Sequence, residues 1–290
     1  MSRRPTASRS LMVTLKDTGR SDNGHEVAQP TGWAKPLTPT FLTKPWGRRD
    51  GLPGSENAQT LGEIVYQSNS LGLVIKWLQT SEALSVQVHP PGPRRKHEWW
   101  HIIEARPGAY IDLGLQETVT PDRIAAAARD GSLSGLLNRI VPLPGDSFYI
   151  EAGTIHAFGP ELTVLKVQEA NDVTYRMFDY GRPRELQVTQ AVGEALLTPS
   201  VPRAFPDDDA PFAVTPITLR AGEKVVVTPE RACLAVISGG GDLADHAFTA
   251  GECWLARGPV ALQAHTQSTF VLAEPRPRNA QTSDDGANDE

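Results

Sequence analysis

The stretch LSVQVH, residues 84–89, alternates apolar and polar side chains without a break. Successive side chains of a β-strand point to opposite faces of the sheet, so Ser85, Gln87 and His89 share one face. At ~3.3 Å per residue these three groups lie within about 14 Å along the strand. The pattern predicts a strand whose apolar face is buried and whose polar face either meets solvent or lines the inside of a barrel.

Other segments also have the composition of strands, with β-branched and aromatic residues between glycine and proline turns. They are residues 71–78, 99–103, 109–113, 147–150 and 162–167 in the first part of the chain, and 224–227, 233–237, 252–256 and 269–272 in the last part. The 25 glycines and 24 prolines among 290 residues also favour a fold with many turns. We therefore expect a mainly β protein.

One helical segment interrupts the predicted strands. Thr120 suits the N-cap of a helix, Pro121 suits its first position, and an alanine-rich run follows to Ala128. Gly131 predicts the end of this helix, and residues 133–137 predict a second, short one. The sequence thus indicates a short helical insert near residues 120–138.

Composition divides the chain into five parts. The polar residues 1–30 predict a flexible N-terminal segment, and residues 31–200 form the expected catalytic domain with the helical insert. The proline- and aspartate-rich residues 201–211 indicate a linker, which is followed by a smaller β domain over residues 212–274. Residues 275–290 predict a disordered tail.

Charge and composition disfavour several classes of protein. The chain has 28 basic and 34 acidic side chains and a net charge of -6, which disfavours a nucleic-acid-binding protein. No apolar run approaches the ~18 residues of a membrane span. The two cysteines, Cys233 and Cys253, do not form the Cys-x-x-Cys pair of a thiolate zinc site. We expect a cytoplasmic protein with no nucleic-acid or membrane partner.

Three segments carry side chains that bind divalent metals. Gln87 and His89 share a strand face, Glu98 begins a β-prone stretch, and Gly153 turns the chain so that His156 can project inward. Two imidazole nitrogens and two oxygens suit zinc or a similar ion, with a position left for water or substrate. The candidate metal ligands are therefore Gln87, His89, Glu98 and His156.

Residues 97–101, HEWWH, offer a competing interpretation. On a helix, the pattern H-E-x-x-H would place His97 and His101 on a zinc ion, with Glu98 as the general base of a metalloprotease. The tryptophans and isoleucines of this segment favour a strand instead, and prolines on both sides confine it. The sequence therefore disfavours the protease.

Four sequence clusters, in this order and spacing, resemble the type I mannose-6-phosphate isomerases, which are zinc-dependent cupins. The clusters are SVQVHP at 85–90, KHE at 96–98, GTIHA at 153–157 and TYRMFDYGRPREL at 174–186. The likeness begins near KPWG at 44–47, runs to about residue 190 and is weaker in the C-terminal part. It implies a cupin fold, a jelly-roll β-barrel, followed by a smaller second β-unit of cupin-like type.

The resemblance also implies a reaction and a set of site residues. The expected reaction interconverts mannose 6-phosphate and fructose 6-phosphate by proton transfer between C1 and C2 through an enediol. It implies one zinc ion per chain and a small sugar phosphate as partner, and we expect a monomer or homodimer. The site residues are Gln87, His89, Glu98 and His156 on the metal, Ser85 and Lys96 at the phosphate with Arg184 as a further cation, and Arg176 and Lys96 in catalysis.

Position 166 departs from the family pattern. Many family members have a glutamate nine residues before the tyrosine that matches Tyr175, whereas this chain has Lys166. A desolvated Lys166 is a candidate catalytic base, and a salt bridge or an altered substrate is an equal alternative. The second interpretation is therefore a metal-binding cupin with a lost or altered isomerase step, which acts on or binds another sugar phosphate.

Overall fold

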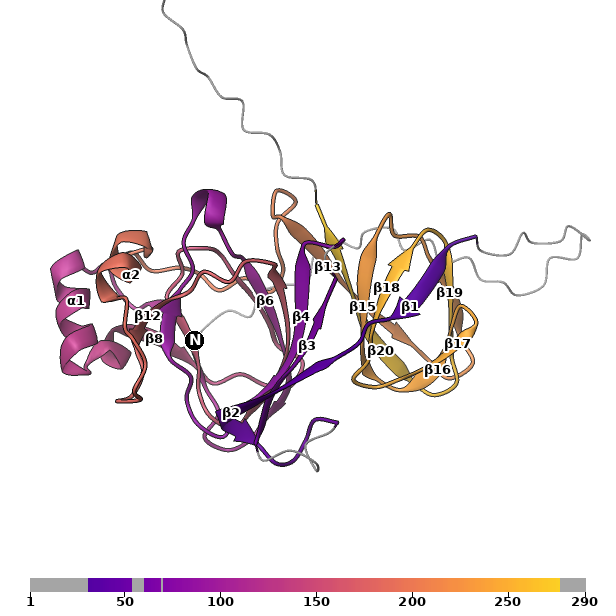
Figure 1. Ribbon diagram of the computed structural model, residues 1–290, viewed down its shortest axis with the longest axis horizontal. Coiled ribbons are helices and arrows are strands. Elements are labelled where there is room, and N and C mark those ends of the chain that lie inside the picture. The colour runs from indigo at the N-terminus through magenta and orange to yellow at the C-terminus, as the bar shows by residue number, and fades with distance from the viewer. Residues whose placement is uncertain (1–30, 54–59, 69, 277–290) are drawn as a thin grey trace, which may run out of the picture.

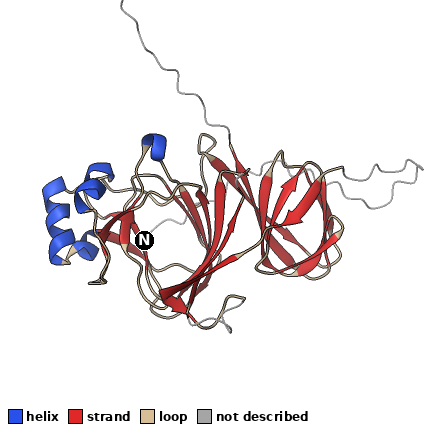
Figure 2. Cartoon of the chain, in the orientation of Figure 1, coloured by secondary structure: helices blue, strands red, loops and turns tan. Residues whose placement is uncertain are grey.

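The computed structural model describes residues 31–53, 60–68 and 70–276, and strands predominate over helices in it (Figure 2). The mainly β class predicted from the sequence is confirmed. The predicted flexible segment 1–30 and residues 277–290 of the predicted tail lie outside the described residues. Within the described ranges, no helix combines the length and apolarity that crossing a bilayer requires.

Two sheets from the first part of the chain pack face to face. The six-stranded sheet has the order β2 (Thr40–Arg48), β3 (Leu61–Gln67), β4 (Leu73–Gln79), β11 (Leu162–Glu169), β6 (Glu98–Ala105) and β9 (Ser147–Ile150). The five-stranded sheet has the order β12 (Tyr175–Phe178), β5 (Val86–Val88), β10 (His156–Phe158), β7 (Ile111–Leu115) and β8 (Leu137–Ile140). Trp100 and Val164 of the first sheet pack with Ile111 and Phe158 of the second. Each sheet ends in two edge strands, so the expected jelly roll is a two-sheet sandwich and not a barrel closed by hydrogen bonds.

Two further sheets come from the last part of the chain. One has the order β1 (Trp33–Pro36), β18 (Cys253–Arg257), β15 (Ala232–Ser238), β20 (Ser268–Pro275) and β13 (Phe212–Leu219). The other has the order β14 (Lys224–Val227), β19 (Val260–Ala264), β16 (Gly240–Leu243) and β17 (His246–Thr249). Strand β1 comes from the segment that the sequence assigns to the first domain, yet it pairs with β18 of the C-terminal sheet. The division into a domain at 31–200 and another at 212–274 stays a prediction, and β1 crosses it.

Other sheets pack on both faces of the six-stranded sheet. Its outer face, which includes Trp77 and Leu165, packs against the C-terminal sheet that contains Phe212 and Leu255. All eight residues of β11 are consequently buried, and this strand does not alternate between solvent-exposed and buried residues. The shared apolar layer holds the two halves of the molecule together, because it removes large side chains of both from water.

The helices cover the outer face of the five-stranded sheet (Figure 1). Helix α1 (Pro121–Asp130) begins after Thr120, whose hydroxyl accepts a hydrogen bond from the Arg123 amide, and ends at Gly131 with φ +86°. A 3-10 turn, η3 (Leu133–Leu136), follows it, and α2 (Val188–Glu194) lies beside it. A short 3-10 turn, η2 (Gly92–Arg94), connects β5 to β6. The predicted helical insert is thus present.

Candidate metal centre

A cavity of about 280 Å³ opens between the two sheets of the first half. Its lining is strongly cationic in a chain of net charge -6. The positively charged lining side chains are Lys44, Lys76, Lys96, Lys166, Arg176 and Arg184, and the carboxylates are Glu63 and Asp172. A cavity of this composition suits an anionic small molecule, because several ammonium and guanidinium groups can face one phosphate.

Three potential metal ligands converge beside this cavity. One ligand atom each of His89, Glu98 and His156 lies within 4.8 Å of the other two, and all three residues are buried. The His89 Nε2 atom is 3.1 Å from Glu98 Oε1. The side-chain amide of Gln87 lies 3.4 Å from His156 Nε2, so the fourth predicted ligand is adjacent. The structure therefore brings together the four residues that the sequence singles out.

Both sheets contribute to this cluster. In the five-stranded sheet, Gln87 on β5 lies directly opposite His156 on β10 on one side and opposite Arg176 on β12 on the other. This row of three polar side chains crosses three adjacent strands. Glu98 reaches the cluster from the facing six-stranded sheet, where it begins β6. The site thus depends on the packing of one sheet on the other.

Backbone carbonyls orient both imidazoles toward Glu98. His89 Nδ1 lies 3.1 Å from the carbonyl oxygen of Val173, and His156 Nδ1 lies 2.8 Å from that of Thr154. Because a carbonyl only accepts hydrogen bonds, these contacts assign the proton to Nδ1 and leave the Nε2 lone pair free for a cation. A neutral His89 Nε2 and Glu98 Oε1 are then two acceptors 3.1 Å apart, an arrangement that a cation between them stabilises.

The charge states of the cluster also suit a metal. Burial lowers the pKa of His156 to about 3, with His89 adding to the effect, and burial also lowers the pKa of His89. Burial alone would raise the pKa of Glu98, but the charge of Lys166 and the nearby imidazoles hold it well below its usual value. Neutral imidazoles and an ionised carboxylate are the forms that bind a divalent ion.

The predicted substrate residues line the same cavity. Lys96 is buried and donates from Nζ to Thr174 Oγ1 at 3.1 Å. Burial, with the charges of Lys166 and Lys76, lowers the pKa of Lys96 to about 8, although Glu98 opposes this shift. Ser85 is buried in the lining.

The two predicted arginines differ in how firmly they are held. Arg184 is engaged by Asp179 through two hydrogen bonds, of 2.5 and 2.7 Å. Arg176 donates from Nη1 to the carbonyl of Glu185 at 3.3 Å, and its buried Nε has no partner in the described part of the chain. At the cavity, Arg176 therefore has a donor, Nε, that no residue of the described chain uses.

The sequence of the chain is similar to those of several curated proteins. No family model matches the chain. Mannose-6-phosphate isomerase ManA of Bacillus subtilis is 35% identical over 145 residues, which are 45% of each chain. A mannose-6-phosphate isomerase of Streptococcus mutans is 34% identical over 193 residues, 60% of this chain and 61% of that protein. The chain is thus similar in sequence to curated mannose-6-phosphate isomerases. It matches only about half of the length of the curated relatives.

Solved mannose 6-phosphate isomerases share the fold. The crystal structure of the Bacillus subtilis enzyme superposes with a TM-score of 0.69 at 23% identity, covering 82% of this chain and 98% of that one. A zinc-bound holo mannose 6-phosphate isomerase superposes with a TM-score of 0.65 at 14% identity, covering 84% of this chain and 100% of that one. The cupin-type architecture predicted from the isomerase resemblance is therefore confirmed over more than four-fifths of the chain.

The metalloprotease interpretation of residues 97–101 is wrong for this chain. The segment lies in strand β6, where alternate side chains face opposite ways. Glu98 belongs to the cluster of candidate metal ligands, whereas His97 hydrogen-bonds Tyr149 at 2.7 Å and His101 hydrogen-bonds Ser147 at 2.9 Å. The two histidines and the glutamate of the motif therefore cannot meet on one ion.

The cavity lining also contains residues that are not among the predicted site residues. Lys76 is the one charged residue in the otherwise mostly apolar strand LVIKWLQ, and it forms an ion pair of 3.0 Å with Glu63. Gln168 is buried in the lining, and its Oε1 has no partner in the described ranges. A charged or amide residue within a buried strand is the signal that would have revealed them.

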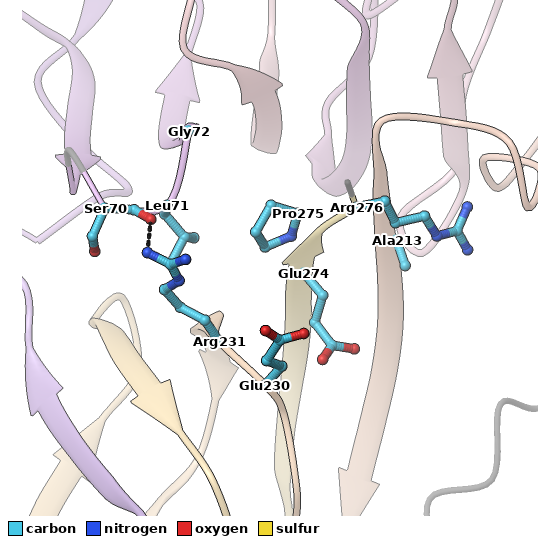
Figure 3. A pocket seen from close by; sticks show the side chains of 9 residues that line it. All are labelled: Ser70, Leu71, Gly72, Ala213, Glu230, Arg231, Glu274, Pro275 and Arg276. Atoms are coloured by element: carbon cyan, nitrogen blue, oxygen red, sulfur yellow. Dashed lines mark hydrogen bonds between the residues drawn. The ribbon is translucent and has the colours of Figure 1, made fainter. Parts of the chain in front are cut away.

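A larger cavity, of about 480 Å³, lies near the turn before β4 and the end of β20 (Figure 3). Its charged lining residues are Glu230, Arg231, Glu274 and Arg276, and Arg231 hydrogen-bonds the carbonyl of Ser70. Burial raises the pKa of Glu274. None of the predicted site residues lines this cavity, and its two carboxylates balance its two guanidinium groups.

The turn that carries His156 depends on Gly153. Its φ is +90°, and its amide donates to the His89 carbonyl at 2.7 Å. The Gly153→Ala variant is expected to lower the free energy of unfolding by about 1–2 kcal/mol, because L-residues are disfavoured at this φ. An alanine Cβ there would also lie 3.1 Å from Leu196 Cγ.

Denaturant unfolding followed by fluorescence measures this effect. Gly135→Ala is the matched control, because a Cβ at Gly135 meets nothing within 4 Å. Equal unfolding free energies for the two variants would contradict the role assigned to the Gly153 turn.

Proposed function

We propose that the protein is a metal-dependent aldose–ketose isomerase that interconverts mannose 6-phosphate and fructose 6-phosphate. The observation that carries this proposal is the convergence of Gln87, His89, Glu98 and His156 beside a cavity lined by six cations. The names of the curated relatives support the same reaction.

The proposed metal ligands are Gln87, His89, Glu98 and His156, and zinc is the proposed ion. The donor set of two imidazoles, one carboxylate and one amide fits zinc with a position left for substrate. The hydrogen bonds of both Nδ1 atoms to carbonyls support this assignment, because they hold each Nε2 in the ligand form. When bound, zinc would supply Lewis-acid stabilisation of negative charge on a sugar oxygen.

The proposed phosphate contacts lie at the cationic lining of the cavity. Ser85 offers a buried hydroxyl, and Arg184 offers a guanidinium that Asp179 fixes in place. Arg176, with an unpartnered Nε in the described chain, is proposed to stabilise the oxyanion that develops as the enediol forms.

The proton transfer between C1 and C2 needs a base, and the cavity offers two lysines. The pKa of Lys96 is lowered to about 8, so a fraction of this side chain is a neutral amine near neutral pH. Lys166 donates to Glu98 at 2.9 Å, and this contact leaves its ammonium in a salt bridge. The lowered pKa of Lys96 supports our assignment of the proton transfer to this side chain, and the catalytic role that the sequence suggests for Lys166 is the less favoured assignment.

A coupled assay of fructose 6-phosphate formation tests the proposal. Mannose 6-phosphate should be turned over, a chelator should abolish the turnover, and added zinc should restore it. Absence of turnover by a fully zinc-loaded sample would rule out this isomerase activity.

One observation favours a second candidate. Lys166 reverses the charge at a position where many isomerases of this type have glutamate, and it is tied to Glu98. The second candidate is a metal-binding cupin with a lost or altered isomerase step that uses another sugar phosphate. Zinc-dependent binding of other hexose phosphates, without turnover of mannose 6-phosphate, would favour it. The cytoplasmic location and the monomeric or homodimeric state stay predictions.

A further inference from the structure

Lys166 contacts the carboxylate that a bound metal would need. Its Nζ atom lies 2.9 Å from Glu98 Oε1, and the same oxygen lies 3.1 Å from His89 Nε2. Glu98 is fully buried and Lys166 nearly so. Water screens such a pair poorly, so the ion pair is a strong local interaction.

The second oxygen of Glu98 is already engaged. Trp100 donates from Nε1 to Glu98 Oε2 at 2.8 Å. Oε1 is then the oxygen that faces the histidines, and the ammonium of Lys166 sits on it. A metal ion and Lys166 therefore compete for one atom.

The strand register holds the ammonium in this place. Lys166 on β11 lies directly opposite Lys76 on β4, and like charges in such a cross-strand pair repel. Lys76 forms its own ion pair with Glu63 at 3.0 Å. Glu63 lies on β3, which flanks β4 on the side opposite to β11, whereas Glu98 lies on β6, beyond β11. The repulsion between the two lysines favours the contact of Lys166 with Glu98.

We propose that Lys166 is a built-in competitor of the metal at Glu98. Its ammonium supplies the positive charge at Oε1 when the metal is absent, and it leaves that oxygen when the metal binds. This inference rests on the proposed metal centre. Two consequences follow from it: zinc binds more weakly than the ligand set alone would allow, and the metal-free protein stays folded because Glu98 is never an unpaired buried charge.

Zinc affinity, measured by competition with a chromophoric zinc chelator, tests the inference. Lys166→Gln removes the competing charge, and it should bind zinc about tenfold or more tightly than the unaltered chain, the scale on which neighbours of metal ligands act. Lys166→Arg keeps the charge and should not gain affinity. If Lys166→Gln does not fold, Lys166→Met keeps an apolar stem and is measured in its place.

The matched control is Lys76→Gln, which removes the same charge from the same cavity without touching a proposed ligand. Its zinc affinity should rise by less than about threefold, because charge effects fall with distance. Melting without metal adds a second readout. Metal-free Lys166→Gln should melt at a lower temperature than the metal-free unaltered chain, and zinc should raise its melting temperature by more.

The outcomes separate this inference from the proposed activity. Equal zinc affinities of Lys166→Gln and the unaltered chain would overturn the competition, and so would equal gains in the two lysine variants. Failure of every variant to bind zinc would overturn the metal centre together with the inference. Tighter zinc binding by Lys166→Gln in a protein that does not turn over mannose 6-phosphate would support the competition and reject only the isomerase activity.

Discussion

His156→Ala is expected to lower isomerase turnover about 1000-fold or more and to lower the zinc content of the purified protein. The variant removes one of the two proposed imidazole ligands, and loss of the metal would forfeit ~4 kcal/mol of stabilisation of the transition state. His156 is well placed for this role because its Nδ1 is fixed by the Thr154 carbonyl and its Nε2 faces the cluster. Turnover and bound zinc are measured on the same sample.

His101→Ala is the control for this variant. His101 is another histidine of the first half, but it hydrogen-bonds Ser147 on the side of β6 away from the cluster. It should keep the turnover and the zinc content of the unaltered protein. Retention of both quantities by His156→Ala would show that His156 is not a ligand.

Arg176→Met is expected to reduce kcat about 100- to 1000-fold with little change in the melting temperature. Loss of one donor aimed at a developing oxyanion has an effect of this size. The fold should tolerate the change, because the described contacts of the guanidinium amount to one bond of 3.3 Å to the Glu185 carbonyl. Steady-state kinetics and thermal melting provide the two measurements.

Two further variants make the result specific. Arg176→Lys keeps the charge and should recover part of the lost kcat. Arg182 lies in the segment that follows β12, outside the cavity lining, and pairs with Glu82 and Asp179, so Arg182→Met should keep the normal kcat. If Arg176→Met raises KM and leaves kcat unchanged, this arginine contributes to substrate binding and not to the reaction step.

Local sequence signals predicted local structure well. The alternation of residues 84–89 placed Gln87 and His89 on one face, and both line the cavity. The Thr120 cap and Gly131 predicted both ends of α1. These features depend on residues that are neighbours in the chain, whose geometry the backbone sets by itself.

Pairing between distant strands could not be predicted in this way. Gln87 and His156 are 69 residues apart and yet directly opposite in the sheet. The sequence left Lys166 as a base, a salt-bridge partner or a sign of an altered substrate, and the structure pairs it with Glu98, 68 residues away on a neighbouring strand. Strand β1 was not expected at all, and it pairs with a strand more than 200 residues later.

By itself, the sequence indicated the proposed donor set and the shared strand face of Gln87 and His89. It also determined the turn at Gly153, because only the local backbone is involved. The tertiary structure decided which carboxylates Lys76 and Lys166 contact and that other sheets pack on both faces of the six-stranded sheet. These choices depend on strand register and sheet packing, which bring together charges that no local pattern relates.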